Sequence, residues 1–508
     1  MAFPVAVASS IRTPGFYLLL NLLAATASPG AAPRRALLVA MKSSAGDITA
    51  DTELRQGLSG PDAVATALGS GMPGHLGAKR IFQRYPLAQV DLVAPAAPAG
   101  VKASGTFTFV APSPVATTRT VEVDVAGRIF SLDWGPAETI TSIAARVVIE
   151  GNARSDDLPV TFSSLAGVVT AEAKEAGTWG NDIRIAIRVY GGGPSSATAS
   201  ASGATLAGGT LLADITDVLE LVELQEYDFI VLAANGNADT NAASATTSPA
   251  LALVHVHDLN HGSMARLQQV IVASTGTLSA TKTGTAYHNA PELEVVLGSG
   301  FRSLPAEIAC AEAAERLVIE STNSVANRCN TTYGSTLYGP ADLTSGALTG
   351  PEVEDALTHG VSPLTFTASG APRMSRPITS HFKDDNGNPD DRAYDVGQVS
   401  GAYEFLRDLR TTVPQEFAGA NIQADVGTTD EPPPPGTVET RDILAFIISR
   451  AQYMIKKGVL DRARIMQAIA NGEFVVRVNP DDGAQVDALV PERTVKPLAK
   501  IGLVMNAV

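Results

Sequence analysis

Cysteine is scarce in this chain of 508 residues, which holds only Cys310 and Cys329. Two cysteines cannot form a disulfide framework, and without a C-x-x-C pair they offer no zinc-finger site. Their spacing leaves a single bond between them open as an alternative. The simpler interpretation is a pair of reduced thiols, one of them on a helix.

Basic clusters are also lacking, since 37 Lys and Arg stand against 52 Asp and Glu and the net charge is −15. A protein that binds nucleic acid needs a basic stripe to displace counterions from phosphate groups. We therefore expect no direct nucleic-acid partner. The acidic balance suits a soluble protein that works in a crowded assembly and must avoid premature association.

Long apolar runs are missing as well, because no stretch reaches the 18 consecutive apolar residues of a membrane-spanning helix. The apolar segment 16–25 resembles a signal peptide, but Pro14 and Gly15 stand at its start and Asn21 interrupts it. We expect this segment to be retained and to pack on another subunit, without stable insertion into a membrane.

Breaks in composition divide the chain into several parts. An Ala- and Pro-rich run ends at Gly100, and a Gly- and Ser-rich run extends from Gly191 to Gly209. The expected parts are an extended N-terminal arm (1–35), the first part of an α/β core (36–97), an inserted β-rich domain (98–195), the main α/β region (196–370), a C-terminal domain (371–492) and a C-terminal arm (493–508).

The expected inserted domain carries short segments in which apolar and polar residues alternate. These segments are 106–110, 120–125 and 183–190. Alternation with a period of two, bounded by Gly and Pro turns, predicts an antiparallel β domain. The β-branched run Val147-Val148-Ile149 does not alternate, and we expect a further strand there.

The regions on either side of the insert have the pattern of an α/β protein. Short apolar runs typical of buried strands occur at 36–40, 229–233, 270–273 and 293–297. Helices are expected at 61–68 with Ser59 as a cap, and at 215–224, 248–260, 303–319, 401–410 and 440–457. Such alternation predicts a mainly parallel sheet that helices cover on both faces. A stiff proline-rich linker (431–436) and a strand (473–478) follow in the last third.

Two motifs that look functional have simpler interpretations. Gly69-Ser70-Gly71-Met72-Pro73-Gly74 matches G-x-G-x-x-G, but a helix is expected before it and Pro73 removes one backbone donor. A tight loop is therefore the better interpretation. The acidic run 384–391 resembles a calcium loop, but it lacks the ligand spacing of an EF-hand, so an exposed turn is expected.

Histidine and serine residues give no complete catalytic or metal-binding pattern. His257 and His261 would share one face of the expected helix, but His255 would point elsewhere and no H-E-x-x-H is present. The segment 261–265 is similar to the histidine motif of subtilisin-type proteases, yet the chain has neither G-T-S-M-A nor G-x-S-x-G. We expect no enzyme activity, no cofactor and no metal, and keep an α/β hydrolase-type enzyme as an alternative.

The order of motifs along the chain resembles that of contractile phage tail sheath proteins, especially the Mu-like type. The pieces that carry the resemblance are 376–382, Asn386-Gly387, 390–396, 403–407, 440–443, 457–461, 474–481, 487–491 and the terminal segment. The family motif leading into a strand is matched by Trp179, Gly180, Asn181 and Asp182, and the N-terminal arm by 10–17. A longer, Gly- and Thr-rich segment at 328–371 and a leucine-rich N-terminal arm depart from the family pattern.

The resemblance implies a fold class and a function. The fold would be an α/β core, subtilisin-like as in sheath proteins but without a catalytic triad. An inserted antiparallel β-rich domain and extended N- and C-terminal arms would complete it. The function implied is that of a structural subunit of the virion, assembled in the host cytoplasm into stacked six-fold, helical rings around a tail tube protein. Baseplate and tail terminator or neck proteins would bind at the ends. The sheath of a phage-derived contractile injection system is an alternative.

The two ends of the chain are expected to act as strand-donating arms. Their candidate residues are Ile11, Pro14, Phe16, Tyr17 and Leu19 in the first arm, and Val495, Leu498, Ile501, Leu503 and Val504 in the second. The expected acceptor strand on a neighbouring subunit contains Phe474, Val475, Val476 and Val478. An unpaired strand must find hydrogen bonds elsewhere, and strand addition to a neighbour supplies them.

Overall fold

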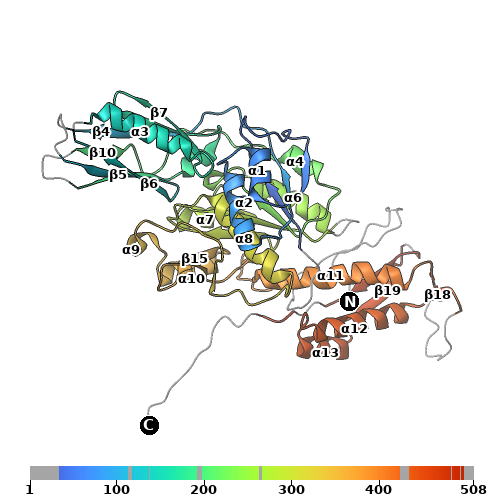
Figure 1. Ribbon diagram of the computed structural model, residues 1–508. Helices are drawn as coiled ribbons and strands as arrows, with labels where there is room; N and C mark the ends of the chain where they lie inside the picture. Colours follow the sequence, from blue (N-terminus) through green and yellow to red (C-terminus); the bar gives the residue numbers. More distant parts are fainter. Residues whose placement is uncertain are drawn as a thin grey trace, which may run out of the picture.

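The structure is a computed structural model that describes residues 34–111, 117–136, 138–191, 197–261, 266–423, 434–481, 483–491 and 494–496. Three bodies follow one another in space: a β-rich insert, an α/β core and a smaller C-terminal unit (Figure 1). The core lies between the other two. The mixed α/β class expected from the sequence is confirmed.

The core is built on one nine-stranded sheet, six of whose strands are parallel. Antiparallel pairs form its two edges. In spatial order the strands are β14 (Thr331–Thr332), β16 (Pro372–Met374), β15 (Ser362–Phe366), β13 (Leu293–Leu297), β12 (Gln269–Ser274), β11 (Phe229–Leu232), β1 (Ala36–Val39), β3 (Val90–Val93) and β2 (Leu54–Leu58). Strands β1, β3, β12 and β13 are buried along their whole length, which is why they appear in the sequence as continuous apolar runs.

Helices cover both faces of this sheet. The connection from β1 to β3 crosses the sheet in one direction and those from β11 to β12 and β12 to β13 in the other, so right-handed crossovers place their helices on opposite faces. The core helices are α1 (Pro61–Leu68), α2 (Pro73–Arg84), α4 (Thr216–Leu221), α5 (Asn237–Thr240), α6 (Ser248–His261), α7 (Leu278–His288), α8 (Pro305–Glu320), α9 (Leu343–Gly346) and α10 (Gly350–Thr358).

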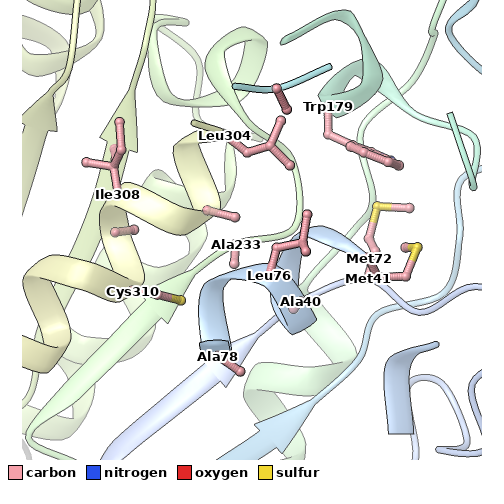
Figure 2. Close-up of a cluster of buried hydrophobic side chains, with 14 of the residues drawn as sticks. Ala40, Met41, Met72, Leu76, Ala78, Trp179, Ala233, Leu304, Ile308 and Cys310 are labelled. Atoms are coloured by element: carbon pink, nitrogen blue, oxygen red, sulfur yellow. The ribbon is translucent and has the colours of Figure 1, made fainter. Parts of the chain in front are cut away.

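Helices α2 and α8 pack closely on each other (Figure 1). The close approach depends on Gly77, because a Cβ atom there would lie 2.6 Å from the Sγ of Cys310. Figure 2 shows Cys310 and Ile308 of α8 in one buried cluster with Leu76 of α2. Such interlocking of small and large side chains is what close-packed protein interiors require.

The insert lies between β3 and β11 in the sequence and forms two antiparallel sheets and a helix. The first sheet has the order β10 (Thr198–Ala201), β4 (Ser104–Val110), β8 (Val168–Ala173) and β7 (Val160–Leu165). The second has the order β6 (Arg128–Trp134), β5 (Arg119–Val125) and β9 (Ile185–Tyr190). Between the sheets, Phe109 meets Trp134 edge-to-face with ring centroids 5.7 Å apart, so the insert has its own aromatic core.

The strand expected at Val147-Val148-Ile149 is wrong, because these residues lie in α3 (Ile140–Ala153). The Thr139 side chain caps the helix by accepting a hydrogen bond from the backbone N–H of Ser142. Packing of the buried helix face on β7 and β8 outweighs the β preference of the branched residues.

Buried ion pairs join the insert to the core. Glu307, at the start of α8, is completely buried and accepts hydrogen bonds from Arg80 of α2 and Arg128 of β6, both at 2.7 Å. On the same side, Arg302 pairs with Asp124 of β5 at 2.6 Å. The insert is therefore held to the core by charges that solvent does not screen.

The C-terminal unit is organised around α11 (Val396–Glu416), a helix that takes part in two hydrophobic clusters. Val399 and Tyr403 pack in a cluster with Leu267 of the core, whereas Phe405 and Leu409 belong to the C-terminal cluster. The unit also contains α12 (Thr440–Lys456), α13 (Arg462–Ala470) and the short strands β17 (Asn421–Ile422), β18 (Thr437–Val438), β19 (Val475–Val478) and β20 (Val486–Leu489).

A network of buried charges lies at the amino ends of the parallel strands, beneath α11. Arg316 of α8 is completely buried. Its guanidinium donates to Glu294 of β13, to Glu320 of α8 and to Ser400 of α11. Its guanidinium also lies 4.2 Å from the ring centre of Phe229. The C-terminal unit thus attaches at the amino ends of the parallel strands, whereas the insert lies at their carboxyl ends.

Several local predictions can be compared directly with the structure. The helix expected at 303–319 is α8, with Pro305 as its first residue, and the helix at 61–68 is α1. The cap expected at Ser59 is wrong, since Gly60 is the N-cap and no side chain caps the helix. The acidic run forms a turn in which the carboxylate of Asp384 accepts from the backbone N–H groups of Asn386 and Asn388.

Candidate assembly interface

The arm residues predicted from the sequence fall mostly outside the described part of the chain. This applies to Ile11, Pro14, Phe16, Tyr17, Leu19, Leu498, Ile501, Leu503 and Val504. Val495 is described, and its side chain is 45% exposed. Next to it, Thr494 forms an isolated antiparallel bridge with Leu460 of the same chain. The first described residues of the C-terminal arm therefore have a partner in their own subunit, which differs from our expectation for this arm.

The predicted acceptor strand is half of a two-stranded hairpin. Strand β19 pairs with β20 in antiparallel register from Val475 opposite Leu489 to Val478 opposite Val486. Phe474 is buried and directly precedes β19. Within the described residues, the sheet consists of these two strands.

One side of this hairpin rests on the C-terminal hydrophobic cluster. Val476, Val486 and Val490 pack against this cluster, which includes Phe474, and β19 contacts α12. All four residues of β19 are only partly buried. An isolated two-stranded hairpin is marginally stable in water, and additional strands along a supported hairpin would increase its stability.

A second candidate region is the Trp179–Asp182 motif, which joins the insert to the core. It forms a single 3₁₀ turn, Thr178–Asp182. Trp179 is buried in the cluster that contains Met41, Met72 and Leu304 of the core (Figure 2). Its indole N–H donates to the carbonyl oxygen of Ala176. Gly180 lies so close to Ala103 and Ala173 that a Cβ atom would be within 2.9 Å of both methyl groups.

The polar residues of this motif hold two loops in place. The Asn181 side-chain amide bonds both the N–H and the carbonyl oxygen of Gly209, each at 2.9 Å. The Asp182 carboxylate accepts from the backbone N–H of Asn237 at 2.7 Å and from its side chain at 2.8 Å. Burial raises the pKa of Asp182 to about 7, although both Asn237 donors favour the ionised form.

The position of Asp182 is informative because open α/β sheets bind ligands outside the carboxyl ends of their strands. Asn237 follows β11, and it also bonds the backbone and hydroxyl of Thr275, which follows β12. Asp182 of the insert therefore occupies the carboxyl edge of these strands. In this fold, the place used for ligands in many α/β enzymes holds the insert in position.

Replacing Asp182 with alanine is expected to lower the free energy of unfolding by about 2 kcal/mol, because two partly buried donors of Asn237 lose this acceptor. Thermal unfolding monitored by circular dichroism measures the effect. Asp214→Ala serves as a control, since that carboxylate is exposed and bonds only its neighbour Thr216. Equal melting temperatures for the two variants would contradict the proposed role.

Two of the three histidines noted in the sequence have described side chains, while the side chain of His261 lies outside the described part of the chain. His255 and His257 lie on α6, where His255 is partly buried and His257 exposed. Burial lowers the pKa of His255, which disfavours its charged form. Among the described residues, no group of three or more His, Cys, Asp or Glu side chains could hold a metal ion.

Both cysteines are free thiols in the structure. Cys310 is buried between α8 and α2, and burial raises the pKa of its thiol. Cys329 is partly exposed and lines a small pocket together with Val325, Asp395 and Val495. The alternative of a bond between the two cysteines is wrong for this structure. Among the described residues, no helix is long and apolar enough to cross a membrane.

No protein-family model matches the chain, and no curated protein matches its sequence. Comparison with solved structures does give matches that cover most of the chain. The structure is similar to the sheath tail protein of Listeria innocua, with 13% identity, a TM-score of 0.43 and coverage of 89% of this chain and 90% of the other. The structure is also similar to the sheath tail protein of Desulfitobacterium hafniense, with 11% identity and a TM-score of 0.44. That similarity covers 92% of this chain and 93% of the other.

The helical sheath of the anti-feeding prophage in its contracted state is also similar, with 10% identity and a TM-score of 0.41. That similarity covers 98% of this chain and 99% of the other. By name, these three structures are two sheath tail proteins and the helical sheath of a prophage.

Proposed function

We propose that this protein is the structural sheath subunit of a contractile tail. In this function it polymerises into stacked hexameric rings around an inner tube and contracts to drive the tube through a host envelope. The proposal includes the subtilisin-like description of the core, without protease chemistry, and the division of the chain at 35, 97, 195, 370 and 492. It applies equally to a phage tail in the virion and to a phage-derived injection system.

The observation that carries the proposal is the hairpin of β19 and β20. It is supported on one side by the C-terminal hydrophobic cluster, and among the described residues it pairs with no further strand. The sequence has one segment with strand-forming residues at each end of the chain, 11–23 and 493–508. The two strands of the hairpin and two donor segments per subunit are the composition of a four-stranded sheet completed by neighbouring copies.

Strand exchange of this kind would explain how a lattice changes shape without coming apart. The exchanged strands keep subunits connected through main-chain hydrogen bonds while the bodies rotate. Contraction would need no nucleotide, because an extended lattice trapped at assembly can release free energy when larger contacts form between bodies. The tail tube, the baseplate and the neck or terminator proteins are the partners that this function requires.

Truncation after Val490 tests the proposal. The variant lacks the C-terminal arm but retains the hairpin of β19 and β20, so we expect folded subunits that do not form tubes in negative-stain electron microscopy. The full-length chain under the same conditions is the positive control, and circular dichroism confirms that the variant folds. Tubes formed equally well by the truncated chain would contradict strand exchange through this arm.

A further inference from the structure

The start of the C-terminal arm is attached to its own subunit at three places. Thr494 is completely buried and forms its bridge with Leu460, in the loop between α12 and α13. The Nζ of Lys496 lies 3.0 Å from the carboxylate of Asp391. Between them, Val495 lines the small pocket that also contains Cys329.

These contacts come from three separate parts of the fold. Leu460 belongs to the C-terminal unit, Asp391 to the segment before α11, and Cys329 to the loop after α8. The surface ion pair alone would contribute little, because both of its side chains are solvent-exposed. The buried bridge at Thr494 is the stronger element, since breaking it would expose main-chain groups that need new partners.

The root of the N-terminal arm is attached in a comparable way. The carboxylate of Asp228, just before β11, accepts from Arg34 Nη1 at 2.7 Å and from the backbone N–H of Arg35 at 2.8 Å. Arg407 of α11 approaches the same carboxylate at 2.9 Å. Burial alone would raise the pKa of Asp228, but Arg407 and Arg34 outweigh it and lower the pKa.

A second carboxylate strengthens this attachment. The guanidinium of Arg35 donates to Asp91 of β3 at 2.8 Å and stacks over the ring of Tyr227. Arg34 and Arg35 are therefore fixed to β3, to the residue before β11 and to α11, and β3 and β11 are the strands on either side of β1. Both arm roots lie against α11 or the segment that leads into it.

We propose that each arm is anchored to its own subunit, at Arg34–Arg35 and at Thr494–Lys496, and that these anchors stay closed while the residues beyond them pair with a second copy of this chain. The inference rests on the proposed function.

The anchors assign a mechanical role to α11. A force on either arm acts first on the anchor and only then on the hydrophobic core. The N-terminal anchor is connected to α11 through the ion pair of Asp228 with Arg407. The C-terminal anchor is connected through Thr494 to the C-terminal unit, which α11 joins to the sheet. The lattice would therefore be connected through the packed, described part of each subunit.

Locking the C-terminal anchor with a disulfide tests the inference. In V495C the new thiol shares a pocket with Cys329, so we expect air oxidation with copper phenanthroline to form an intramolecular bond in the folded subunit. Mass spectrometry of the peptides identifies the bond. Cys310 does not compete, because it is buried between two helices. The double variant V495C/C329S cannot lock and is the matched control.

Assembly of the locked subunit decides the outcome. We expect oxidised V495C to form tubes as efficiently as the reduced variant and as V495C/C329S. Failure of the oxidised form alone to assemble would overturn the inference, because the anchor would then have to open. Failure of the disulfide to form would also overturn it.

Hydrogen–deuterium exchange gives a second measurement that covers both anchors. The backbone amides of Arg35 and Thr494 should be at least as protected in tubes as in free subunits. Loss of protection on assembly would contradict closed anchors. If the wild-type chain formed no tubes under any condition, the proposed function itself would fail, which is a different result from failure of the locked variant alone.

Discussion

Replacing Glu307 with glutamine is expected to lower the free energy of unfolding by about 3–5 kcal/mol, the typical cost of removing one partner from a buried ion pair. Glu307 is completely buried and is bonded by Arg80 and Arg128. Its carboxylate also accepts from the backbone N–H of Leu304 at 3.1 Å. The glutamine would leave two buried guanidinium groups without a negative charge, and the insert would lose a main attachment to the core.

The same ion pairs give this contribution a defined pH dependence. Burial alone would raise the pKa of Glu307, but Arg128 and Arg80 hold it at about 2. Since the folded-state pKa is depressed, the stabilisation is present above the unfolded value of about 4.5 and is lost as pH falls toward 2. Wild-type protein should lose stability in this window, and the difference from Glu307→Gln should shrink.

Urea unfolding followed by tryptophan fluorescence measures the effect of Glu307→Gln, because Trp134 and Trp179 both lie in the insert. Glu315→Gln on the same helix is the matched control, since its partner Arg84 keeps contact with solvent. A loss of the same size in both variants would show that burial of the Glu307 pairs is not what determines the effect.

The main features of the fold were predictable because they depend on local patterns. The apolar runs at 36–39, 229–232 and 293–297 are buried parallel strands, as expected. Continuous apolar stretches arise where a strand is covered on both faces. The helix with Pro305 in its first turn was equally clear, since proline at that position loses no helical hydrogen bond.

The error at α3 shows the limit of residue preferences. Ile143, Ala144, Val147 and Gly151 are buried with the three- and four-residue spacing of a helix, and Thr139 precedes them as an N-cap. This periodicity and the cap could have identified the helix from the sequence. The three β-branched residues at 147–149 instead favoured a strand, because their preference was considered without the helical period.

The buried charges were not predictable from local sequence. Glu307, Glu312, Glu315 and Arg316 would normally form a solvated face of α8, yet all four are buried. Their partners Arg80, Arg128 and Arg328 lie far away in sequence or in another element. Only tertiary contacts can reveal such pairs, and the same holds for the anchors at Asp228 and Thr494.

Replacing Glu294 with glutamine is expected to remove a loss of stability that wild-type protein shows on going from weakly acidic to alkaline pH. Glu294 of β13 is almost completely buried, and burial together with the nearby Glu312 carboxylate raises its pKa to about 8. The Nη1 of Arg316 lies 3.1 Å from the carboxylate of Glu294, but the same guanidinium also donates to Glu320, Gln269 and Ser400. Its charge therefore compensates that of Glu294 incompletely.

The direction of this pH dependence follows from whether the folded or the unfolded state binds the proton of Glu294. Between pH 4.5, the ordinary pKa of a glutamate, and its folded-state pKa of about 8, Glu294 is protonated in the folded protein and ionised in the unfolded chain. The unfolded state therefore binds fewer protons, and the free energy of unfolding falls by about 1 kcal/mol per pH unit as pH rises through this window. Glutamine has a similar shape but cannot ionise, so Glu294→Gln should match wild type near pH 5 and exceed it near pH 8.

Urea unfolding at several pH values between 5 and 8.5 measures the difference between Glu294→Gln and wild type. Glu352→Gln is the matched control, because that exposed carboxylate bonds Thr349 and its pKa is lowered, so it stays ionised across the window. A difference for Glu294→Gln that does not grow with pH would mean that Glu294 is ionised in the folded protein. In that case Arg316 would compensate it fully, and the charges beneath α11 would form a balanced network rather than one that holds a proton.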